Sequence, residues 1–283
     1  MAPKETVLIT GCSDDGIGYG LAAEFQKRDY HVFATARDIS RMSKLQDLPN
    51  VTLLQLDVVN PDHVKAAVKT VTKVTGGTLN YLINNAGQSR FMPILDEDID
   101  AVKALFDVHL YGPMALTKAF APLIIKAKGT FAFTTSVSGY VSIPWMGTYS
   151  ATKRSLEIMA ETLRLEVQPF GVNVIEFVSG AVESQGLTKS GDWALPADSL
   201  YKPIEGTIKS RAQGNDGMPR MPLKDYAVAV TDAMIERAPG KFWYGQNADM
   251  VKMSTTNTAV PQVAMDAGFI IGTGLDDMLK QAE

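Results

Sequence analysis

The 283-residue sequence predicts a single-domain α/β fold, in which a doubly wound parallel sheet carries helices on both faces. Short apolar, β-branched runs alternate with longer helix-like segments along the first 180 residues. Runs that are apolar throughout, rather than alternating, are typical of strands covered on both faces of a parallel sheet. Repeated strand–helix–strand units imply right-handed crossovers and ligand binding beyond the carboxyl ends of the strands.

Seven strands are expected along the chain, six of them in the first 180 residues. They are Thr6–Thr10, His31–Thr35, Val51–Leu56, Leu79–Ile83, Thr130–Thr134, Val172–Val178 and Lys241–Tyr244. Helical patterns include Gly18–Arg28, Asp62–Val74, Tyr149–Val167 and Leu223–Arg237. Residues 183–222 mix Gly, Pro, Ser and charge with scattered apolar side chains, which is typical of a lid, a binding loop or a disordered segment.

Composition and charge narrow the classes of partner and the compartment. A net charge of -4 provides no basic footprint for nucleic acid or an anionic membrane. The best apolar run, around residues 114–125, is interrupted by Lys118 and is too short to span a bilayer. The single cysteine, Cys12, cannot form an intrachain disulfide, and the first residues show no apolar signal region. We therefore expect a cytoplasmic protein without a membrane span; no metal site is predicted.

A glycine-rich loop follows the first strand and precedes a helical pattern. It reads Thr10-Gly-Cys-Ser-Asp-Asp-Gly-Ile-Gly18, so that Gly11, Ser13, Gly16, Ile17 and Gly18 are candidate contacts for a dinucleotide. Glycines at such a turn let the backbone approach a pyrophosphate at a helix N-terminus. An ordinary tight turn is the alternative. Two features favour the dinucleotide. The loop follows the first strand of an alternating strand–helix pattern, and a second strand follows at the distance expected for a residue that binds the ribose.

The end of the second strand indicates which dinucleotide. It carries Arg37 and no acidic residue that would bind a free ribose 2′-hydroxyl. A guanidinium suits a 2′-phosphate through paired, charge-assisted hydrogen bonds, so we expect NADP(H) rather than NAD(H). Two features oppose this: Asp14 and Asp15 would repel a phosphate, and Arg37 could be a solvated surface charge.

Tyr149 and Lys153 are four residues apart in a helical stretch and therefore share a helix face. A nearby ammonium and an oxidised nicotinamide would lower the phenol pKa toward the working pH of a general acid. Ser136, at a predicted strand end thirteen positions earlier, could hold a substrate oxygen as charge develops on it. Ser138 is a competing candidate, and the Tyr–Lys spacing by itself is a pattern that chance supplies.

The combination resembles the short-chain dehydrogenase/reductase family over roughly the first 190 residues, which implies a Rossmann-type fold. The motifs that carry the resemblance are the glycine loop, Asp57 after the third strand, Asn84-Asn-Ala-Gly87, Ser136, Tyr149-Ser-Ala-Thr-Lys153 and Ser179-Gly-Ala-Val-Glu-Ser184. The resemblance implies that Asp57 and Val58 contact the adenine. Asn85, Ala86 and Gly87 would line the middle of the cofactor, and Val182 and Ser184 would meet the nicotinamide carboxamide and phosphates. Lys153, beside Tyr149, would also bind the nicotinamide ribose.

Three departures from the family pattern matter. The glycine loop has one residue more than usual, as in a mainly fungal branch similar to acyl-dihydroxyacetone-phosphate reductases. His109 stands where the family usually has an Asn that supports a water-linked proton path from the lysine. It could serve that path, titrating near physiological pH, or be a packed core histidine. Ser179 replaces the usual Pro before Gly180, which is expected to loosen the turn locally.

These features predict an NADPH-dependent reductase of a ketone or aldehyde, reversible to alcohol oxidation, with catalytic residues Ser136, Tyr149, Lys153 and His109. Residues 1–182 would form the cofactor-binding and catalytic core, 183–222 a substrate-binding lid and 223–283 a C-terminal helix, strand and tail. Apolar side chains between Trp193 and Ile208 favour an apolar, medium-sized substrate, unless they simply pack onto the body. A non-redox isomerase or cyclase, and an NADP-sensing regulator, are the alternatives. The family resemblance implies a homodimer or homotetramer.

Overall fold

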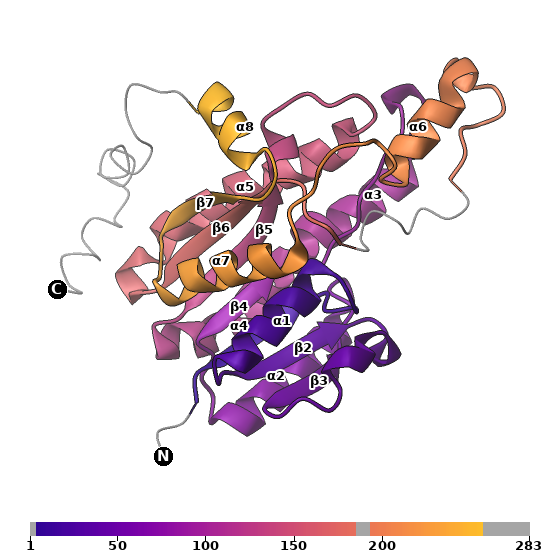
Figure 1. Ribbon diagram of the computed structural model, residues 1–283. Helices are drawn as coiled ribbons and strands as arrows, with labels where there is room; N and C mark the ends of the chain where they lie inside the picture. Colours follow the sequence, from indigo (N-terminus) through magenta and orange to yellow (C-terminus); the bar gives the residue numbers. More distant parts are fainter. Residues whose placement is uncertain (1–3, 185–192, 257–283) are drawn as a thin grey trace.

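One seven-stranded parallel sheet organises the molecule (Figure 1). The computed structural model describes residues 4–184 and 193–256. The strand order is β3-β2-β1-β4-β5-β6-β7, and every neighbouring pair runs parallel. The chain reverses its winding between β1 and β4, which is where such sheets bind ligands. The predicted doubly wound, Rossmann-type fold is confirmed.

The strands match the sequence prediction to within two residues at each end. Their bounds are Thr6–Thr10 (β1), His31–Ala36 (β2), Val51–Gln55 (β3), Tyr81–Asn84 (β4), Thr130–Ser136 (β5), Asn173–Ser179 (β6) and Gly240–Tyr244 (β7). β1 and β4 are buried along their whole length, as their unbroken apolar composition predicts for strands that are covered on both faces.

Helices cover both faces of the sheet. α1 (Ile17–Lys27) and α7 (Leu223–Ile235) lie side by side on one face, where Gly20 brings α1 close to Leu223 and Ala227 (Figure 1). The other face carries α2 (Pro61–Thr75), α4 (Gly112–Ala127) and α5 (Gly147–Glu166), which share a second buried apolar cluster with the strands. The two clusters are separated by the sheet itself, as in a doubly wound fold.

Several helical features of the described residues were not predicted from the sequence. The short helix α6 (Glu205–Ala212) lies inside the predicted lid, and α8 (Ala248–Thr255) follows β7 in the segment taken as a weakly patterned tail. Between α3 (Ile99–Phe106) and α4, residues Asp107–Tyr111 form a turn of π-helix. The rest of the predicted tail, residues 257–283, and residues 185–192 of the predicted lid lie outside the described residues.

The continuous helical stretch Ile99–Ala127 is long and apolar enough to cross a membrane by length and composition alone. In this fold its second half is a core helix, because Leu116, Phe120 and Ile124 are fully buried against the sheet. Residues 114–125 alone are too short to span a bilayer, and the helical residues before them supply the additional length.

Candidate active site

The glycine-rich loop is shaped for close backbone approach at the carboxyl end of β1. Gly11 has φ +75°, and a Cβ there would lie 2.9 Å from the backbone Cα of Ala86. A Cβ on Gly18 would lie 2.5 Å from the carbonyl oxygen of Gly11. α1 starts after Gly16 with no side-chain cap and no acid in its first turn. Its first N–H groups and the positive end of its dipole therefore fit an anionic pyrophosphate.

The segment that follows β4, beginning at Asn85, is hydrogen-bonded to the end of β1 next to that loop. The Thr10 hydroxyl accepts hydrogen bonds from the backbone N–H groups of Asn85 and Ala86, both at 2.9 Å. The Asn85 side chain donates to the Thr10 carbonyl at 2.8 Å. Asn85 and Ala86 thus lie beside the glycine loop, and the Asn85 amide braces the two strand ends. Gly87 lies against His109, whose Nε2 would be 3.0 Å from a Cβ on that glycine.

The remaining predicted cofactor contacts also lie at the carboxyl edge of the sheet. Asp57 is half-buried just beyond β3, and its backbone N–H donates to the His63 ring at 3.1 Å. The Val58 side chain is buried against Gly112, so that only its backbone can face a ligand. Val182, beyond β6, is buried and bridges to Met221, and Ser184 is half-buried two residues later.

Tyr149, Lys153 and Ser136 come together between β5 and the start of α5. Lys153 is 5% exposed, and its Nζ donates to the Thr134 carbonyl at 2.8 Å. The same Nζ lies 5.7 Å from the centre of the Tyr149 ring. Ser136, the last residue of β5, interacts with the Tyr149 hydroxyl and favours its ionised form. The face of α5 that carries Tyr149 and Lys153 therefore lies against the carboxyl end of β5, as the sequence predicts.

Ser138 supports Ser136 instead of replacing it. The Ser136 oxygen accepts a hydrogen bond from the Ser138 hydroxyl at 3.0 Å and another from the Ser138 backbone N–H at 3.2 Å. With both acceptor positions occupied, the Ser136 proton is left to be donated outward. Ser138 itself is 3% exposed. The geometry therefore favours Ser136 as the group that holds a substrate oxygen.

In the chain without cofactor the Tyr149 pKa lies above its ordinary value; the predicted lowering, which also involves the positive ring of an oxidised nicotinamide, stays a prediction. Burial, the largest cause, raises the pKa of Tyr149 to about 12, although part of the side chain stays exposed, and the Ser136 hydroxyl opposes the rise. Burial also lowers the pKa of Lys153 to about 8. The attraction between an ammonium and a phenolate follows from the spacing of Tyr149 and Lys153, whereas the desolvation of both groups depends on their burial in the fold.

His109 is buried in the π-helical turn and is held at both ring nitrogens. Its Nε2 accepts from the Gln88 backbone N–H at 3.0 Å, and Nδ1 lies 2.8 Å from the Thr152 hydroxyl. Because that hydroxyl donates to the Tyr149 carbonyl at 2.7 Å, the bonds require a proton on Nδ1 of a neutral ring. Burial and the Lys153 charge lower the pKa of His109 to about 2. Titration near physiological pH is therefore excluded, and the water-linked path past His109 stays a prediction.

Ser179 does not loosen the turn before Gly180. Its hydroxyl lies 2.6 Å from the Tyr226 hydroxyl on α7 and donates to the Phe177 carbonyl at 3.1 Å. The next residue must be glycine, because a Cβ on Gly180 would lie 2.2 Å from the Gln246 carbonyl oxygen. A hydrogen bond to α7 thus constrains the position that proline usually occupies.

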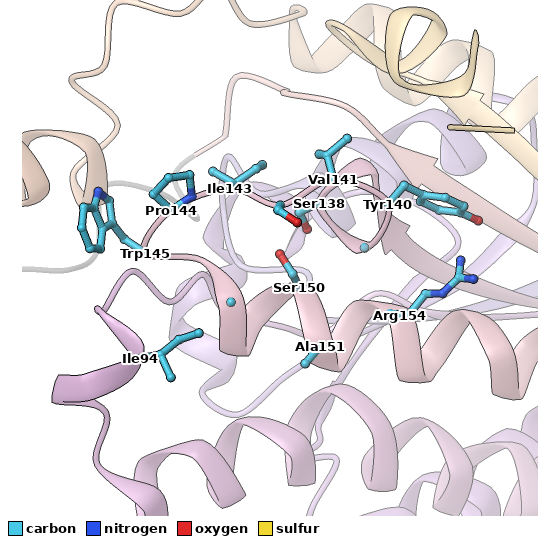
Figure 2. Close-up of a pocket in the computed structure, with 13 residues that line it drawn as sticks. Ile94, Ser138, Tyr140, Val141, Ile143, Pro144, Trp145, Ser150, Ala151 and Arg154 are labelled. Atoms are coloured by element: carbon cyan, nitrogen blue, oxygen red, sulfur yellow. The ribbon is translucent and has the colours of Figure 1, made fainter. Parts of the chain in front are cut away.

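A cavity of about 590 Å³ opens between the β5–α5 loop and the first turns of α5 (Figure 2). Ile143, Pro144 and Trp145 lie at one end, and Tyr140 and Arg154 at the other. The lining residues are Ile94, Ser138, Gly139, Tyr140, Val141, Ser142, Ile143, Pro144, Trp145, Gly147, Ser150, Ala151 and Arg154. Tyr149 and Ser136 are not among them. Ser138 connects the cavity to Ser136 through its hydrogen bond to that residue.

Trp145 is held in a strained conformation where this cavity meets the predicted lid. Its φ is +71°, which a bulky residue rarely adopts, and its carbonyl accepts from the Met92 N–H at 2.7 Å. Its ring packs edge-on against Tyr201, with the centroids 5.0 Å apart. From the same predicted lid, the Trp193 indole donates to the Phe91 carbonyl at 2.6 Å. Within the predicted lid, Tyr201 thus contacts the cavity wall at Trp145, and Trp193 fastens the lid to the segment after β4.

Other apolar residues of the predicted lid support both interpretations of this segment, packing onto the body and contact with a substrate. Leu195 and Ile208 are buried, so they pack onto the body, whereas Leu200 is 81% exposed.

Comparisons with known proteins agree with this geometry. Residues 5–194 match the family described as short chain dehydrogenase. The chain belongs to this family. A short-chain dehydrogenase of Penicillium crustosum is 42% identical over 245 residues, covering 87% of this chain and 90% of the relative. An NADPH-dependent 1-acyldihydroxyacetone phosphate reductase of Schizosaccharomyces pombe is 40% identical over 212 residues, covering 74% and 71%. The crystal structure of a Streptomyces avermitilis short-chain dehydrogenase is similar in fold, with TM-score 0.78, 23% identity and full coverage of both chains.

As a family member the chain is an oxidoreductase that binds a nicotinamide cofactor. The structure adds supporting residues that the motifs did not reveal. Thr134 acts through its backbone carbonyl and Gln88 through its N–H, so side-chain chemistry leaves no signal for either. For Trp145 and its neighbours the sequence does carry a signal, an apolar run between Ser136 and Tyr149.

Proposed function

We propose that this protein is an NADPH-dependent carbonyl reductase with Tyr149 as the general acid. The observation that carries the proposal is the convergence of Tyr149, Lys153 and Ser136 at the carboxyl end of β5, beside the glycine-rich loop. A protein that only senses a cofactor has no need of a proton donor set in this way.

The residues of the loop and strand ends fit the cofactor. Gly11, Ser13, Gly16, Ile17 and Gly18 would hold the pyrophosphate through backbone N–H groups and the helix dipole. The adenine would lie against Asp57 and the Val58 backbone. The middle of the cofactor would lie over Asn85, Ala86 and Gly87. The nicotinamide end would meet Val182, Ser184 and Lys153, next to Tyr149.

NADPH is preferred because of the charge at the end of β2. Arg37 is exposed immediately after the strand, and the acid beside it, Asp38, already accepts hydrogen bonds from the Ser40 N–H and hydroxyl. The Schizosaccharomyces pombe relative, named as NADPH-dependent, supports the same choice. Arg37→Ala should weaken NADPH binding far more than NADH binding. An unchanged preference would remove this part of the proposal.

When bound, NADPH supplies a hydride to the carbonyl carbon. Ser136 donates a hydrogen bond to the carbonyl oxygen, because the two bonds from Ser138 leave its own proton directed outward. The pKa of Tyr149, raised to about 12, keeps the phenol protonated at neutral pH and available to protonate the developing alkoxide. Lys153, while charged, stabilises the phenolate that this leaves behind.

His109 is proposed as a positioning residue. Its Nδ1–H fixes the Thr152 hydroxyl, which in turn binds the Tyr149 carbonyl, and its ring packs edge-on to Tyr149 with centroids 5.6 Å apart. It thereby holds the first turn of α5 against the β4 side of the sheet. Because it stays neutral, it carries no charge of its own through the reaction cycle.

The substrate is proposed to be an apolar, medium-sized ketone or aldehyde. The cavity of about 590 Å³ lies within the range of small-molecule sites and has an apolar end at Ile143, Pro144 and Trp145. The Ser150 hydroxyl on the cavity wall is buried with no hydrogen-bond partner in the described part of the chain. It could therefore satisfy a polar group of the substrate.

Exposed apolar side chains on α4 and α5 support a homodimer or homotetramer. Tyr111, before α4, is 58% exposed, Met114 on α4 46%, and Ile158 on α5 56%. A cytoplasmic location is proposed on the basis of the single, buried Cys12.

The test is NADPH oxidation, followed by loss of absorbance, with a panel of ketones and aldehydes of increasing apolar size. Tyr149→Phe should abolish turnover while NADPH still binds. Tyr30→Phe is the matched control and should keep full activity, because Tyr30 lies at the amino end of β2, at the edge of the sheet opposite the site. Substrate turnover without cofactor consumption would favour the isomerase alternative. Binding without any turnover across the panel would favour the sensor.

A further inference from the structure

Asp14, in the glycine-rich loop, forms a hydrogen-bonded latch to the segment after β2. Its Oδ2 accepts from the Ser43 N–H at 3.1 Å and from the Ser43 hydroxyl at 2.7 Å. Its Oδ1 accepts from the Lys44 N–H at 3.1 Å. Its own N–H donates to the Arg41 carbonyl at 2.7 Å. One residue thus makes four hydrogen bonds across a gap of almost thirty positions in the sequence.

The latched segment is Ile39–Leu45, a distorted 3₁₀ helix with Asp38 as its cap. Met42 and Leu45 bury their side chains in the core, while Arg41 points outward and is exposed, as is Arg37 just before the segment. Neither guanidinium makes a hydrogen bond or ion pair within residues 4–184 and 193–256. Two cationic side chains are therefore available at the end of β2, on a backbone that Asp14 holds in place.

The acids that seemed to oppose a phosphate are already engaged. Asp14 is surrounded by three donors, and Asp15 pairs with the Lys44 Nζ at 2.6 Å. Asp38 accepts from the Ser40 N–H at 2.9 Å and hydroxyl at 2.7 Å, which lowers its pKa. The hydrogen bonds turn the Asp14 and Asp38 carboxylates toward donors of the protein, and the Lys44 ammonium balances the charge of Asp15. Asp38 also attracts Arg41, its neighbour in the same segment, without a hydrogen bond between the two side chains.

We propose that Asp14 is a positioning residue for cofactor specificity. It fastens residues 38–45 to the glycine-rich loop so that Arg37 and Arg41 together bind the 2′-phosphate of NADPH. The inference rests on the proposed NADPH dependence and adds a second arginine and the latch that orients both. Fixing the backbone before binding lowers the ordering cost when a ligand immobilises long side chains.

The latch and simple electrostatic repulsion predict opposite changes in NADPH affinity for the same substitution of Asp14. If Asp14 acts only as a negative charge near the phosphate, Asp14→Asn should tighten NADPH binding. If Asp14 is the latch, the same substitution loses acceptor bonds and should weaken NADPH binding. Asp15→Asn is the charge control: it removes one negative charge from the same loop and one ion pair, to the Lys44 ammonium, but none of the four Asp14 hydrogen bonds.

The experiment measures dissociation constants for NADPH and for NADH by titration calorimetry, with no substrate present. The ratio of the two constants isolates the 2′-phosphate, since both cofactors share the pyrophosphate contacts. Asp14→Ala should lower the preference for NADPH about tenfold, equivalent to about 1.4 kcal/mol. Asp14→Asn should lower it less, Arg41→Ala should also lower it, and Asp15→Asn should leave it unchanged or raise it.

The two proposals fail in different ways. A wild-type protein without any NADPH preference would overturn both. A wild-type preference that Asp14→Asn and Asp14→Ala leave intact, or increase, would overturn the latch alone. A parallel loss of both cofactors at constant ratio would also overturn it, because that is the signature of general damage to the loop. If Asp14→Ala does not fold, Ser43→Ala removes the 2.7 Å bond alone, and an unchanged ratio there would count against the latch.

Discussion

Lys153→Met should make the protein without cofactor more stable at pH 7 and remove its activity. Lys153 is 5% exposed, and burial lowers its pKa to about 8 from 10.5. The depressed pKa means that the fold disfavours the ammonium by about 3 kcal/mol relative to the unfolded chain. Methionine has a similar length and no charge to bury. It leaves the Thr134 carbonyl without the bond from Nζ, at a cost of about 1–2 kcal/mol. The net gain expected at pH 7 is about 1–2 kcal/mol.

The predicted difference in stability between Lys153→Met and the wild type changes sign as the pH rises. Below pH 8 Lys153 is charged in both the folded and the unfolded chain, so the wild type bears the full desolvation cost. Between pH 8 and 10.5 the folded state loses its proton before the unfolded state does, and the wild type becomes more stable relative to the variant. Above 10.5 the cost is gone, and the variant should be less stable by the lost hydrogen bond.

The assay is thermal unfolding of wild type and variant, without cofactor, at half-unit steps from pH 7 to pH 10.5. The midpoint of Lys153→Met should lie a few degrees above the wild type at pH 7 and fall below it at the alkaline end. Lys118→Met, at an exposed position on α4, is the control and should show no crossing. A variant that is less stable at pH 7, or a constant difference across the range, would refute the reasoning.

Three further predictions concern the frame of the site. Gly11→Ala should lower the free energy of unfolding by more than about 2 kcal/mol and weaken the binding of both cofactors, because its Cβ would clash with Ala86 at positive φ. Gly206→Ala is the control: a Cβ there meets nothing within 4 Å, so chemical unfolding should show a neutral or stabilising effect. Tyr226→Phe should lose about 1 kcal/mol by the same assay, since the Ser179 hydroxyl loses one of its two hydrogen-bond partners; no loss would show that this bond is dispensable. His109→Asn should lower kcat without introducing or removing a limb of the pH–rate profile between pH 5 and 8, because His109 stays neutral there; a limb that disappears in the variant would restore a titrating relay.

The sheet and the principal residues of the site were predictable because their signals are local. Each strand is a short apolar run bounded by turn residues, and Ser136 and Tyr149 stand at the ends of such elements. Parallel strands carry their carboxyl ends to one edge, so order along the chain is enough to bring these residues together. The same logic placed the glycine-rich loop beside Asn85.

What was missed depends on tertiary packing. The pKa directions of Tyr149 in the chain without cofactor and of His109 follow from burial, which the pattern of residue types does not measure. Glu176 shows the same limit within a correctly predicted strand. It is fully buried at the centre of β6, and burial beside Glu161 raises its pKa well above the ordinary range. The role of Asp14 also required the fold, since its partners Ser43 and Lys44 lie beyond the second strand.

The central claim is that Tyr149, Lys153 and Ser136 serve a hydride transfer from NADPH to a carbonyl carbon. The most direct measurement uses NADPH deuterated at both C4 positions and mass spectrometry of the alcohol formed from the best carbonyl in the panel. We predict a product one mass unit heavier than that formed with unlabelled NADPH, and none with Tyr149→Phe. A product that forms without the label, or one that Tyr149→Phe makes at the wild-type rate, would contradict the account.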